Sequence, residues 1–217
     1  MTNPAEALRL NRREVVRRLL AARGDAAVIA GLGAPAWDVA AAGDDDRNFY
    51  LWGGMGGAAM IGLGMALAQP TRRVLVITGD GEMLMGLGSL ATIARQRPRN
   101  LAIVVLDNGH FGETGMQPSH TADGYGATRL AAVASACGFP FSTDVTTEPE
   151  LAALATALHD RGDLQFARVR IAPDELPRVL PERDGERIKA KFRAAVAPPA
   201  ALRRSPLPGP TERLSES

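Results

Sequence analysis

Apolar runs and segments of helical periodicity alternate along most of this chain. The two most continuous runs, Val74–Thr78 and Leu101–Leu106, are rich in β-branched residues, which is typical of strands that are buried on both faces. Between them, Leu84–Arg95 has the spacing of a helix that buries one side. Strand, helix and strand in this order predict a right-handed crossover that joins two parallel strands.

The same reasoning predicts the other elements. Asn11 is expected to cap the first helix, and the arginines at positions 12, 13, 17 and 18 are expected to lie largely on its solvated face. The further expected helices are Asn11–Arg23, Pro35–Ala41, Ala58–Ala68, Arg129–Cys137, Glu148–Arg161 and Gly185–Val196, and the further strands are Ala26–Ala30, Asn48–Leu51, Phe139–Phe141 and Phe166–Ile171. This alternation predicts an α/β fold with one doubly wound, mainly parallel sheet and helices on both faces.

One domain accounts for this pattern, since 217 residues are enough for a single α/β domain with a full core. We expect it to occupy residues 1–196, with a core at residues 11–171 and a C-terminal extension at residues 172–196. Residues 197–217 are rich in proline and polar side chains and are predicted to form a disordered tail.

Polar clusters follow both central strands at the point where each strand ends. Gly79-Asp80-Gly81 follows the first strand, and Asp107-Asn108-Gly109 follows the second. The carboxyl ends of neighbouring parallel strands meet at one edge of a sheet, where ligands bind, so Asp80 and Asn108 are expected to converge. A carboxylate and an amide oxygen suit Mg²⁺, and the N–H groups of Gly81 and Glu82 suit phosphate oxygens. Taken singly, each cluster would indicate only a turn or the end of a strand.

Composition and charge exclude several classes of function. A net charge of +1 gives no electrostatic reason to expect nucleic acid or a membrane surface as a partner. The single Cys137 excludes an intramolecular disulfide, fits a cytoplasmic location, and is expected to be a buried structural thiol. No zinc-ligand spacing, P-loop or dinucleotide-binding fingerprint is present, and no signal peptide is visible.

Residues 110–126 have no periodicity and are predicted to form a long functional loop over the metal site. His120 is a candidate to orient or protonate a reacting group, and Gln117, Ser119 and Thr121 are candidates to bind an acid group; ordinary solvated loop residues are the alternative for each. Glu113 is a weaker candidate. No Arg or Lys lies between Asn100 and Thr128, so a cation for a second acid group would have to come from elsewhere.

Four segments of this chain together resemble enzymes that use thiamine diphosphate. Gly79-Asp80-Gly81 followed by Asn108 resembles their GDG…N signature, and Trp52–Gly56 (WGGMG) resembles the segment that meets the aminopyrimidine ring of the cofactor. Two more segments, Gly88–Ala94 (GSLATIA) and Asn108–Thr121 (NGHFGETGMQPSHT), are similar to the small β-subunits of sulfopyruvate decarboxylase and to the matching half of phosphonopyruvate decarboxylase. The resemblance covers about Asn11 to Ile171.

This resemblance implies roles for individual residues. Mg²⁺ would be held by the side chains of Asp80 and Asn108 and by the carbonyl of His110. A glycine carbonyl at Gly53 would accept a hydrogen bond from the cofactor, and Met55 would support its V shape. The residues implied to bind thiamine diphosphate are Gly53, Gly54, Met55, Gly79, Asp80, Gly81, Glu82 and Asn108, with His120 and Gln117 as catalytic candidates.

The implied activity is decarboxylation of a 2-oxo acid, either sulfopyruvate or phosphonopyruvate. The alternatives are another thiamine-dependent decarboxylase or carboligase that takes an uncharged substrate, and a non-catalytic partner that keeps the fold. The family also needs a glutamate beside the aminopyrimidine. Before Gly53 the chain has only Glu6 and Glu14, and neither is placed to reach that ring. A separate pyrimidine-binding subunit is therefore expected to supply the glutamate.

Overall fold

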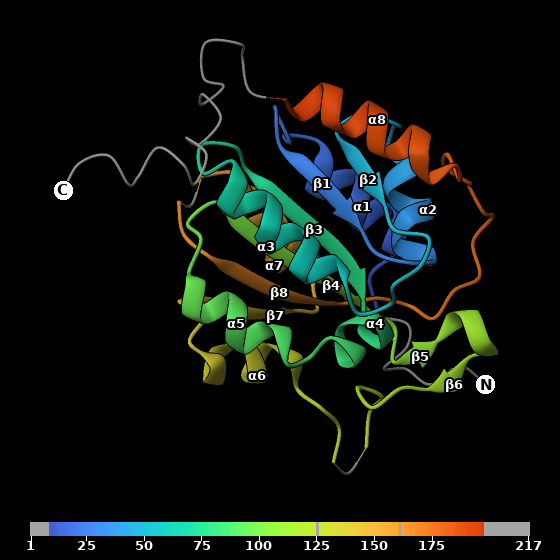
Figure 1. The fold of residues 1–217 in the computed structure, drawn as a ribbon. Helices are drawn as coiled ribbons and strands as arrows, with labels where there is room; N and C mark the ends of the chain where they lie inside the picture. Colours follow the sequence, from blue (N-terminus) through green and yellow to red (C-terminus); the bar gives the residue numbers. More distant parts are fainter. Residues whose placement is uncertain (1–8, 125, 161, 198–217) are drawn as a thin grey trace, which may run out of the picture.

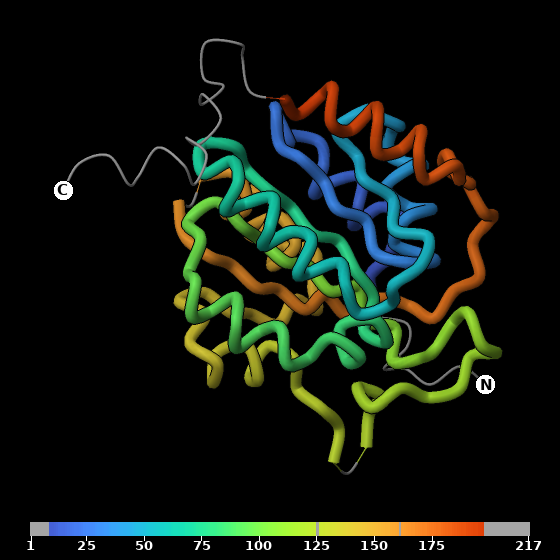
Figure 2. Tube along the Cα trace, in the orientation of Figure 1, coloured from blue at the N-terminus to red at the C-terminus, as the bar shows by residue number. Residues whose placement is uncertain are grey.

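Six strands form one parallel sheet in the computed structural model, which describes residues 9–124, 126–160 and 162–197 (Figures 1 and 2). Their order across the sheet is β2-β1-β3-β4-β8-β7, and every neighbouring pair is parallel. The strands are β1 (Ala27–Ala30), β2 (Asn48–Tyr50), β3 (Val74–Gly79), β4 (Leu101–Asp107), β7 (Phe141–Val145) and β8 (Gln165–Arg170). All residues of β4 are buried, as the continuous apolar run predicts.

Helices cover both faces of this sheet (Figure 1). One face packs against α1 (Arg12–Leu20), α2 (Ala34–Ala41) and α7 (Glu148–Asp160), and the other packs against α3 (Ala58–Ala68), α5 (Ser89–Gln96) and α6 (Leu130–Cys137). Helix α8 (Gly185–Val196) lies beside the edge strand β2, with Phe192 against Phe49. The predicted doubly wound α/β fold is thus confirmed. None of the described helices is long and apolar enough to cross a membrane.

The segment after β3 differs from its prediction. We expected a separate GDG turn and one helix over Leu84–Arg95, whereas α4 (Asp80–Met85) begins directly at the end of β3 and α5 is a second helix. The break falls at Gly86, where the backbone passes so close to Gly56 that a Cβ would lie 2.3 Å from its carbonyl oxygen. Only glycine allows that approach, so the chain turns there instead of continuing as one helix.

Residues 110–126, predicted as an irregular loop, contain a short hairpin. Strands β5 (His110–Phe111) and β6 (Gln117–Pro118) pair antiparallel and enclose a 3₁₀ turn, Gly112–Thr114. Beyond β6 the chain returns to the sheet and buries Ser119 and Thr121. The hairpin therefore projects from the edge of the sheet while the segment after it is part of the interior.

Two predictions about single side chains were wrong. Asn11 caps α1 as expected, since its side chain accepts hydrogen bonds from the N–H groups of Arg13 and Glu14, but Arg12 is not on a solvated face. It is 5% exposed and paired with the fully buried Asp38 at 2.8 Å. Cys137 is half-buried, not fully buried. The tail predicted at residues 197–217 lies, apart from Ala197, outside the described residues.

Candidate active site

A cavity of about 250 Å³ lies beyond the carboxyl ends of β1 and β3. The chain passes from β1 to β2 on one side and from β3 to β4 on the other, so this is the point where the strand order changes direction and where doubly wound sheets bind ligands. Its walls come from five segments and two single residues: Leu32–Pro35 with Trp37, the loop at Met55, Gly79–Glu82, Asn108–Met116 and Ile171–Arg178, with Arg12 of α1 and Leu106 of β4.

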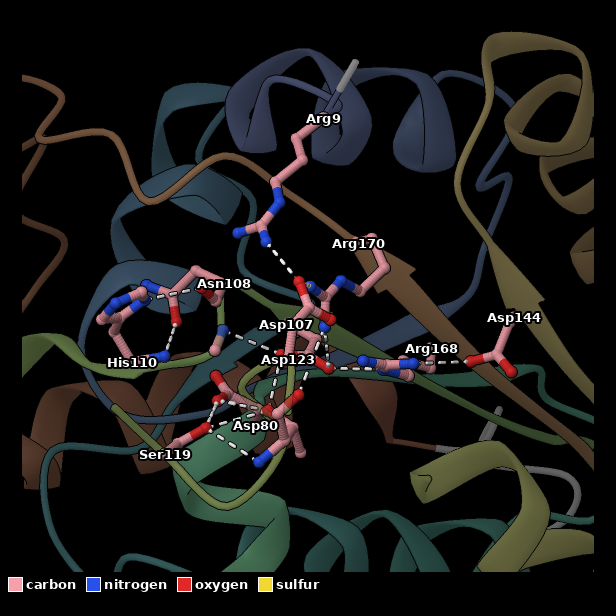
Figure 3. Close-up of polar contacts among 12 residues, drawn as sticks. Arg9, Asp80, Asp107, Asn108, His110, Ser119, Asp123, Asp144, Arg168 and Arg170 are labelled. Atoms are coloured by element: carbon pink, nitrogen blue, oxygen red, sulfur yellow. Dashed lines mark hydrogen bonds and ion pairs between the residues drawn. The ribbon is translucent and has the colours of Figure 1, made fainter. Parts of the chain in front are cut away.

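Asp80 forms the floor of this cavity. Its side chain is almost fully buried, and its Oδ2 accepts hydrogen bonds from the hydroxyls of Ser119 at 2.5 Å and Thr121 at 3.0 Å (Figure 3). Burial, and then the negative charge of Asp107, raise the pKa of the Asp80 carboxyl above its usual range, while the two hydroxyls oppose that shift. An ionised Asp80 therefore lowers the stability of the folded protein unless a cation offsets its charge.

Behind Asp80 lies a second buried carboxylate, Asp107. Thr121 joins the two, because its hydroxyl is 2.7 Å from Asp107 Oδ1. Asp107 is fully buried, accepts a hydrogen bond from the N–H of Gly109 at 2.9 Å, and forms an ion pair with Arg168 (Figure 3). Arg170 lies 3.7 Å from the same carboxylate oxygen, Oδ2. This set of contacts fixes where the chain after β4 and the chain after β6 lie.

The hydroxyl groups of Ser119 and Thr121 have too few protons to donate a hydrogen bond to every oxygen atom within reach. Thr121 has one hydroxyl proton, yet it lies within hydrogen-bond distance of both Asp80 and Asp107. The contact with Asp107 is the shorter, and Ser119 lies 2.9 Å from Thr121 as well as next to Asp80. Asp80 thus has acceptor capacity that Ser119 and Thr121 cannot satisfy at the same time as Asp107.

Glu82, one turn into α4, holds the loops of the cavity together. It is 4% exposed, and its carboxylate accepts hydrogen bonds from the N–H of Leu32 at 2.9 Å, the hydroxyl of Thr78 at 2.9 Å and the N–H of Ala58 at 3.3 Å. A Cβ on Gly31 would lie 2.1 Å from this carboxylate, so the turn after β1 requires glycine there. The side chain of Glu82 is therefore structural. Phosphate binding, which the sequence suggested for this residue, is left to its backbone N–H group.

Asn108 and His110 line the wall opposite α2. The side-chain oxygen of Asn108 accepts a hydrogen bond from the N–H of His110 at 2.9 Å, and the ring Nδ1 of His110 lies 2.8 Å from the carbonyl of Asn108 (Figure 3). An amide oxygen has two lone pairs, so this turn leaves Asn108 one further acceptor position.

These features match one known family. Residues 38–166 fit the model of the thiamine pyrophosphate enzyme C-terminal TPP-binding domain, which is more than half of the chain. The chain belongs to this family. Its fold is also found in solved structures: benzoylformate decarboxylase from Polynucleobacter necessarius superimposes with a TM-score of 0.63 over 82% of this chain and 36% of that one, at 20% identity.

Relatives of two different lengths are similar to this TPP-binding domain. The sulfopyruvate decarboxylase β-subunit of Methanothermobacter thermautotrophicus is 39% identical over 84% of this chain and 94% of its own length. The phosphonopyruvate decarboxylase of Streptomyces viridochromogenes is also 39% identical, over 93% of this chain but only 50% of its own length. The chain therefore spans about half of the longer relative.

Most of the residues expected to bind the cofactor meet at the cavity of the TPP-binding domain, and the rest do not. Those that line it are Met55, Gly79, Asp80, Gly81, Glu82, Asn108 and His110. Among the lining residues that the structure describes, neither Gly53 nor Gly54 is present; both are exposed in the loop before Met55. A Cβ on Gly81 would lie 2.8 Å from the ring of Phe111 and 3.7 Å from the Met55 methyl group, so the wall is tightly closed at that point.

The four candidate residues on the hairpin and just after it lie in two different places. Ser119 and Thr121, expected to bind a substrate acid group, instead bind Asp80 in the interior, because the chain turns back into the sheet after β6. Gln117 and His120 are exposed and do not line the cavity; Gln117 bonds to Thr114, and His120 lies edge-on to Phe111. The structure does not bring these two to Asp80, and their catalytic role remains a prediction.

Sequence reasoning missed the residues that surround this site. The pair Asp107–Arg168 had a visible signal, since Arg168 and Arg170 are charged residues two positions apart in an otherwise apolar strand. Trp37 and Arg178 had none, because they are far apart in the sequence and meet only in the fold, where the Arg178 guanidinium lies 4.7 Å from the centre of the Trp37 ring.

Proposed function

We propose that this chain is the diphosphate-binding subunit of a thiamine diphosphate-dependent 2-oxo acid decarboxylase that acts on sulfopyruvate or phosphonopyruvate. The observation that carries the proposal is the cavity at the switch point, where Asp80 and Asn108 meet the first turns of two helices. The substrate class follows from the names of the relatives that match most of the chain.

Two helix N-termini favour a diphosphate group in this cavity. Helix α2 begins at Ala34 and α4 begins at Asp80, both helices line the cavity with their first residues, and neither has a side-chain cap. First-turn N–H groups have no acceptor inside a helix, and the helix dipole favours negative charge there. We assign the N–H groups of Gly81 and Glu82 to the diphosphate of thiamine diphosphate, as the family resemblance implies.

The donor set suits Mg²⁺. Among the described residues, no group of three or more His, Cys, Asp and Glu is arranged to hold a metal, so a softer transition-metal site has no support here. One carboxylate at Asp80, one amide oxygen at Asn108 and the carbonyl of His110 make a hard oxygen set that Mg²⁺ usually completes with phosphate oxygens. The unsatisfied acceptor capacity of Asp80 and the raised pKa of its carboxyl are the features that such a dication would offset.

The cofactor supplies the carbon chemistry when it is bound, by accepting the electron pair that decarboxylation releases. The residues of this chain hold and orient it. Met55 lies beside Gly81 at the mouth of the cavity, where it is placed to support the bend of the cofactor, and Gly53 precedes it with an exposed backbone that suits a contact with the aminopyrimidine ring.

We further propose that catalysis needs a second, pyrimidine-binding subunit. Three described glutamates line the cavity: Glu82, whose carboxylate is already bound by three donors, and Glu113 and Glu175, which are exposed and lie outside the loop that carries Met55. The β-subunit relative matches this chain along nearly its whole length, whereas the longer decarboxylase has as much sequence again. The glutamate that the family requires would come from the protein that corresponds to that other half.

A substrate panel tests the proposal. The chain is assayed alone and with its pyrimidine-binding partner, at saturating Mg²⁺ and thiamine diphosphate, for release of CO₂ from sulfopyruvate, phosphonopyruvate, pyruvate and a branched 2-oxo acid. We expect turnover only for the assembled enzyme and fastest for one of the two acidic substrates. Faster turnover of pyruvate or the branched acid would overturn the substrate class, and full activity of the chain alone would overturn the shared site.

A further inference from the structure

The acidic substrates need a cation that the sequence did not locate. The hairpin and its flanks contain no Arg or Lys, and Ser119 and Thr121, which we expected to bind the acid group, are used by Asp80. The walls of the cavity also carry several carboxylates. An anionic ligand therefore needs positive charge from another part of the fold.

Two of the described lining residues carry a guanidinium group, Arg12 and Arg178. Arg12 is neutralised, because it is buried against Asp38 at 2.8 Å. Arg178 forms no ion pair with any carboxylate of the described residues, and its guanidinium lies 4.7 Å from the centre of the Trp37 ring. When a planar guanidinium stacks on an aromatic face, its N–H groups point outward from the edge of the guanidinium plane, so they stay available to an acceptor.

The segment that carries Arg178 is held in place on both sides. We call residues 172–184, which join β8 to α8, the strap; Figure 1 shows it passing around the carboxyl ends of β1 and β2. Arg13 donates a hydrogen bond to the carbonyl of Pro177 at 2.8 Å, and the indole N–H of Trp52 donates one to the carbonyl of Glu182 at 2.7 Å. The position of Arg178 at the cavity is thus set by main-chain contacts of its neighbours.

Two further donors on this side of the cavity lack partners. Among the described residues, the buried Nε of Arg12 and the buried indole Nε1 of Trp37 have no hydrogen-bond acceptor, and both residues line the cavity. Both N–H groups are shielded from solvent, so they do not reach a ligand in the open cavity themselves. Because buried N–H groups are satisfied in most native proteins, these two leave uncompensated partial positive charge in residues of its lining.

We propose that Arg178, stacked on Trp37 at the rim of the cavity, binds a tetrahedral oxyanion group of the bound ligands. The inference rests on the proposed function, which offers two sources of that chemistry: the terminal phosphate of the cofactor, and the phosphonate or sulfonate of the substrate. Either one presents oxygens that the guanidinium fork matches in pairs. Asp174 and Glu175 precede Arg178 on the strap, but both are exposed and screened by solvent.

The chain offers a matched control. Arg183, on the same strap, lies over the ring of Trp52 at 5.3 Å in the same kind of contact, but it does not line the cavity. The variants Arg178→Gln and Arg183→Gln therefore remove the same charge and the same stacking interaction, one at the cavity and one away from it. Arg178→Lys keeps the charge without the planar fork.

The experiment has two arms on the assembled enzyme. Calorimetry measures the Kd of Mg²⁺-thiamine diphosphate, and steady-state kinetics at saturating cofactor measure KM for phosphonopyruvate, sulfopyruvate and pyruvate. If Arg178 binds the cofactor phosphate, Arg178→Gln raises that Kd about tenfold and leaves the ratio of the KM values unchanged. If it binds the substrate, KM for the acidic substrates rises about tenfold while KM for pyruvate and the cofactor Kd do not change.

In either case Arg183→Gln is expected to have no effect, and Arg178→Lys to recover part of the loss. Unchanged Kd and KM values in Arg178→Gln would overturn the inference, and so would equal losses in both Gln variants, which would indicate general support by the strap. A parent enzyme that binds no thiamine diphosphate would instead refute the proposed function, whatever Arg178 does.

Discussion

The two ends of the cavity are built in different ways. The inner wall, which consists of Asp80 at the cavity and of Asp107, Ser119 and Thr121 behind it, is at most 5% exposed, and its members bind one another at the ends of β3 and β4. The rim consists of Met55, the β5–β6 hairpin and the strap, where Met55 is 37% exposed and Arg178 lies on the surface. Gln117 on the hairpin and His120 just after it are also exposed, but they do not line the cavity.

This difference separates two tasks. Side chains that are fixed by several buried hydrogen bonds keep their geometry before any ligand arrives, which a metal and diphosphate site requires. Side chains at an exposed rim remain available to a substrate or a partner subunit. We therefore expect substitutions of the inner wall to act on metal and cofactor binding and on stability, and substitutions of the rim to act on turnover and on substrate choice.

The largest effect is expected at Asp80. Asp80→Ala removes the only side-chain carboxylate of the proposed Mg²⁺ site, so activation by Mg²⁺ and thiamine diphosphate should be lost below detection in calorimetry of the assembled enzyme. Asn108→Ala should weaken cofactor binding several-fold to about a hundredfold, because a neutral ligand is lost. Since burial raises the pKa of the Asp80 carboxyl, its charge costs stability in the folded apoprotein, and the Ala variant is expected to fold.

The control for Asp80 is Asp163→Ala. This side chain is 24% exposed, pairs with Arg97 at 3.3 Å and does not line the cavity. It should bind the cofactor as the parent does. Undiminished affinity for Mg²⁺-thiamine diphosphate in Asp80→Ala would contradict the metal assignment and with it the role of the inner wall.

The second prediction compares two carboxylates that contact the same arginine. Asp107 is fully buried and Asp123 has a side chain that is 73% exposed, yet both approach Arg170, at 3.7 and 2.8 Å. Asp107→Asn leaves Arg168, whose side chain is 13% exposed, with only Asp144 as a carboxylate partner, and should lower the free energy of unfolding by about 3 kcal/mol. Asp123→Asn should lower it by less than about 1 kcal/mol. Urea denaturation midpoints measure both, and equal losses would show that burial does not distinguish them.

The third prediction concerns the hydroxyls that hold Asp80. Thr121→Val keeps the volume but removes the group between Asp80 and Asp107, so the unfolding free energy should fall by about 1–3 kcal/mol and the affinity for Mg²⁺ by roughly tenfold. Ser119→Ala, which loses the contacts with Asp80 and Thr121 but leaves Thr121 bound to both carboxylates, should weaken Mg²⁺ binding with a smaller change in stability. Thr156→Val, a surface threonine of α7 bonded to Ala152, is the control. Mg²⁺ affinity equal to that of the control would mean that these hydroxyls do not position Asp80.

The two side chains of the proposed metal site could be placed from the sequence because each one follows a buried strand. Asp80 and Asn108 directly follow apolar runs, and the hydrophobic pattern places both at one edge of the sheet. The bounds of helices α3 and α8 were also predicted to the residue; α3 is an apolar run that ends before Gln69, and α8 begins after a capping Asp184. The break at Gly86 was not predictable, because it depends on contact with Gly56, which is distant in the sequence.

The contacts that depend on long-range packing of loops could not be predicted, for the same physical reason. Arg178 reaches Trp37 only because the strap passes around the sheet, and no periodicity records that path. The direction of Ser119 and Thr121 was likewise hidden, because two hydroxyls in a polar loop look the same whether they face solvent or a buried aspartate. The sequence was sufficient to place side chains at strand ends. It was not sufficient to place side chains whose position depends on the path that a loop takes back to the sheet.

The smallest effect is expected at Met55 and tests the rim alone. Its side chain is partly exposed and lies next to Gly81, where we propose that it supports the bent cofactor. Met55→Leu nearly conserves volume and should be tolerated. Met55→Ala should lower kcat several-fold, since loss of the support lets the cofactor shift from its reactive geometry, while the melting temperature changes little. Met60→Ala, which truncates a methionine of α3 that is 41% exposed and outside the cavity, should change neither quantity. If kcat and melting temperature fell together in Met55→Ala, Met55 would be a packing residue, and the separation of the rim from the inner wall would not hold at this position.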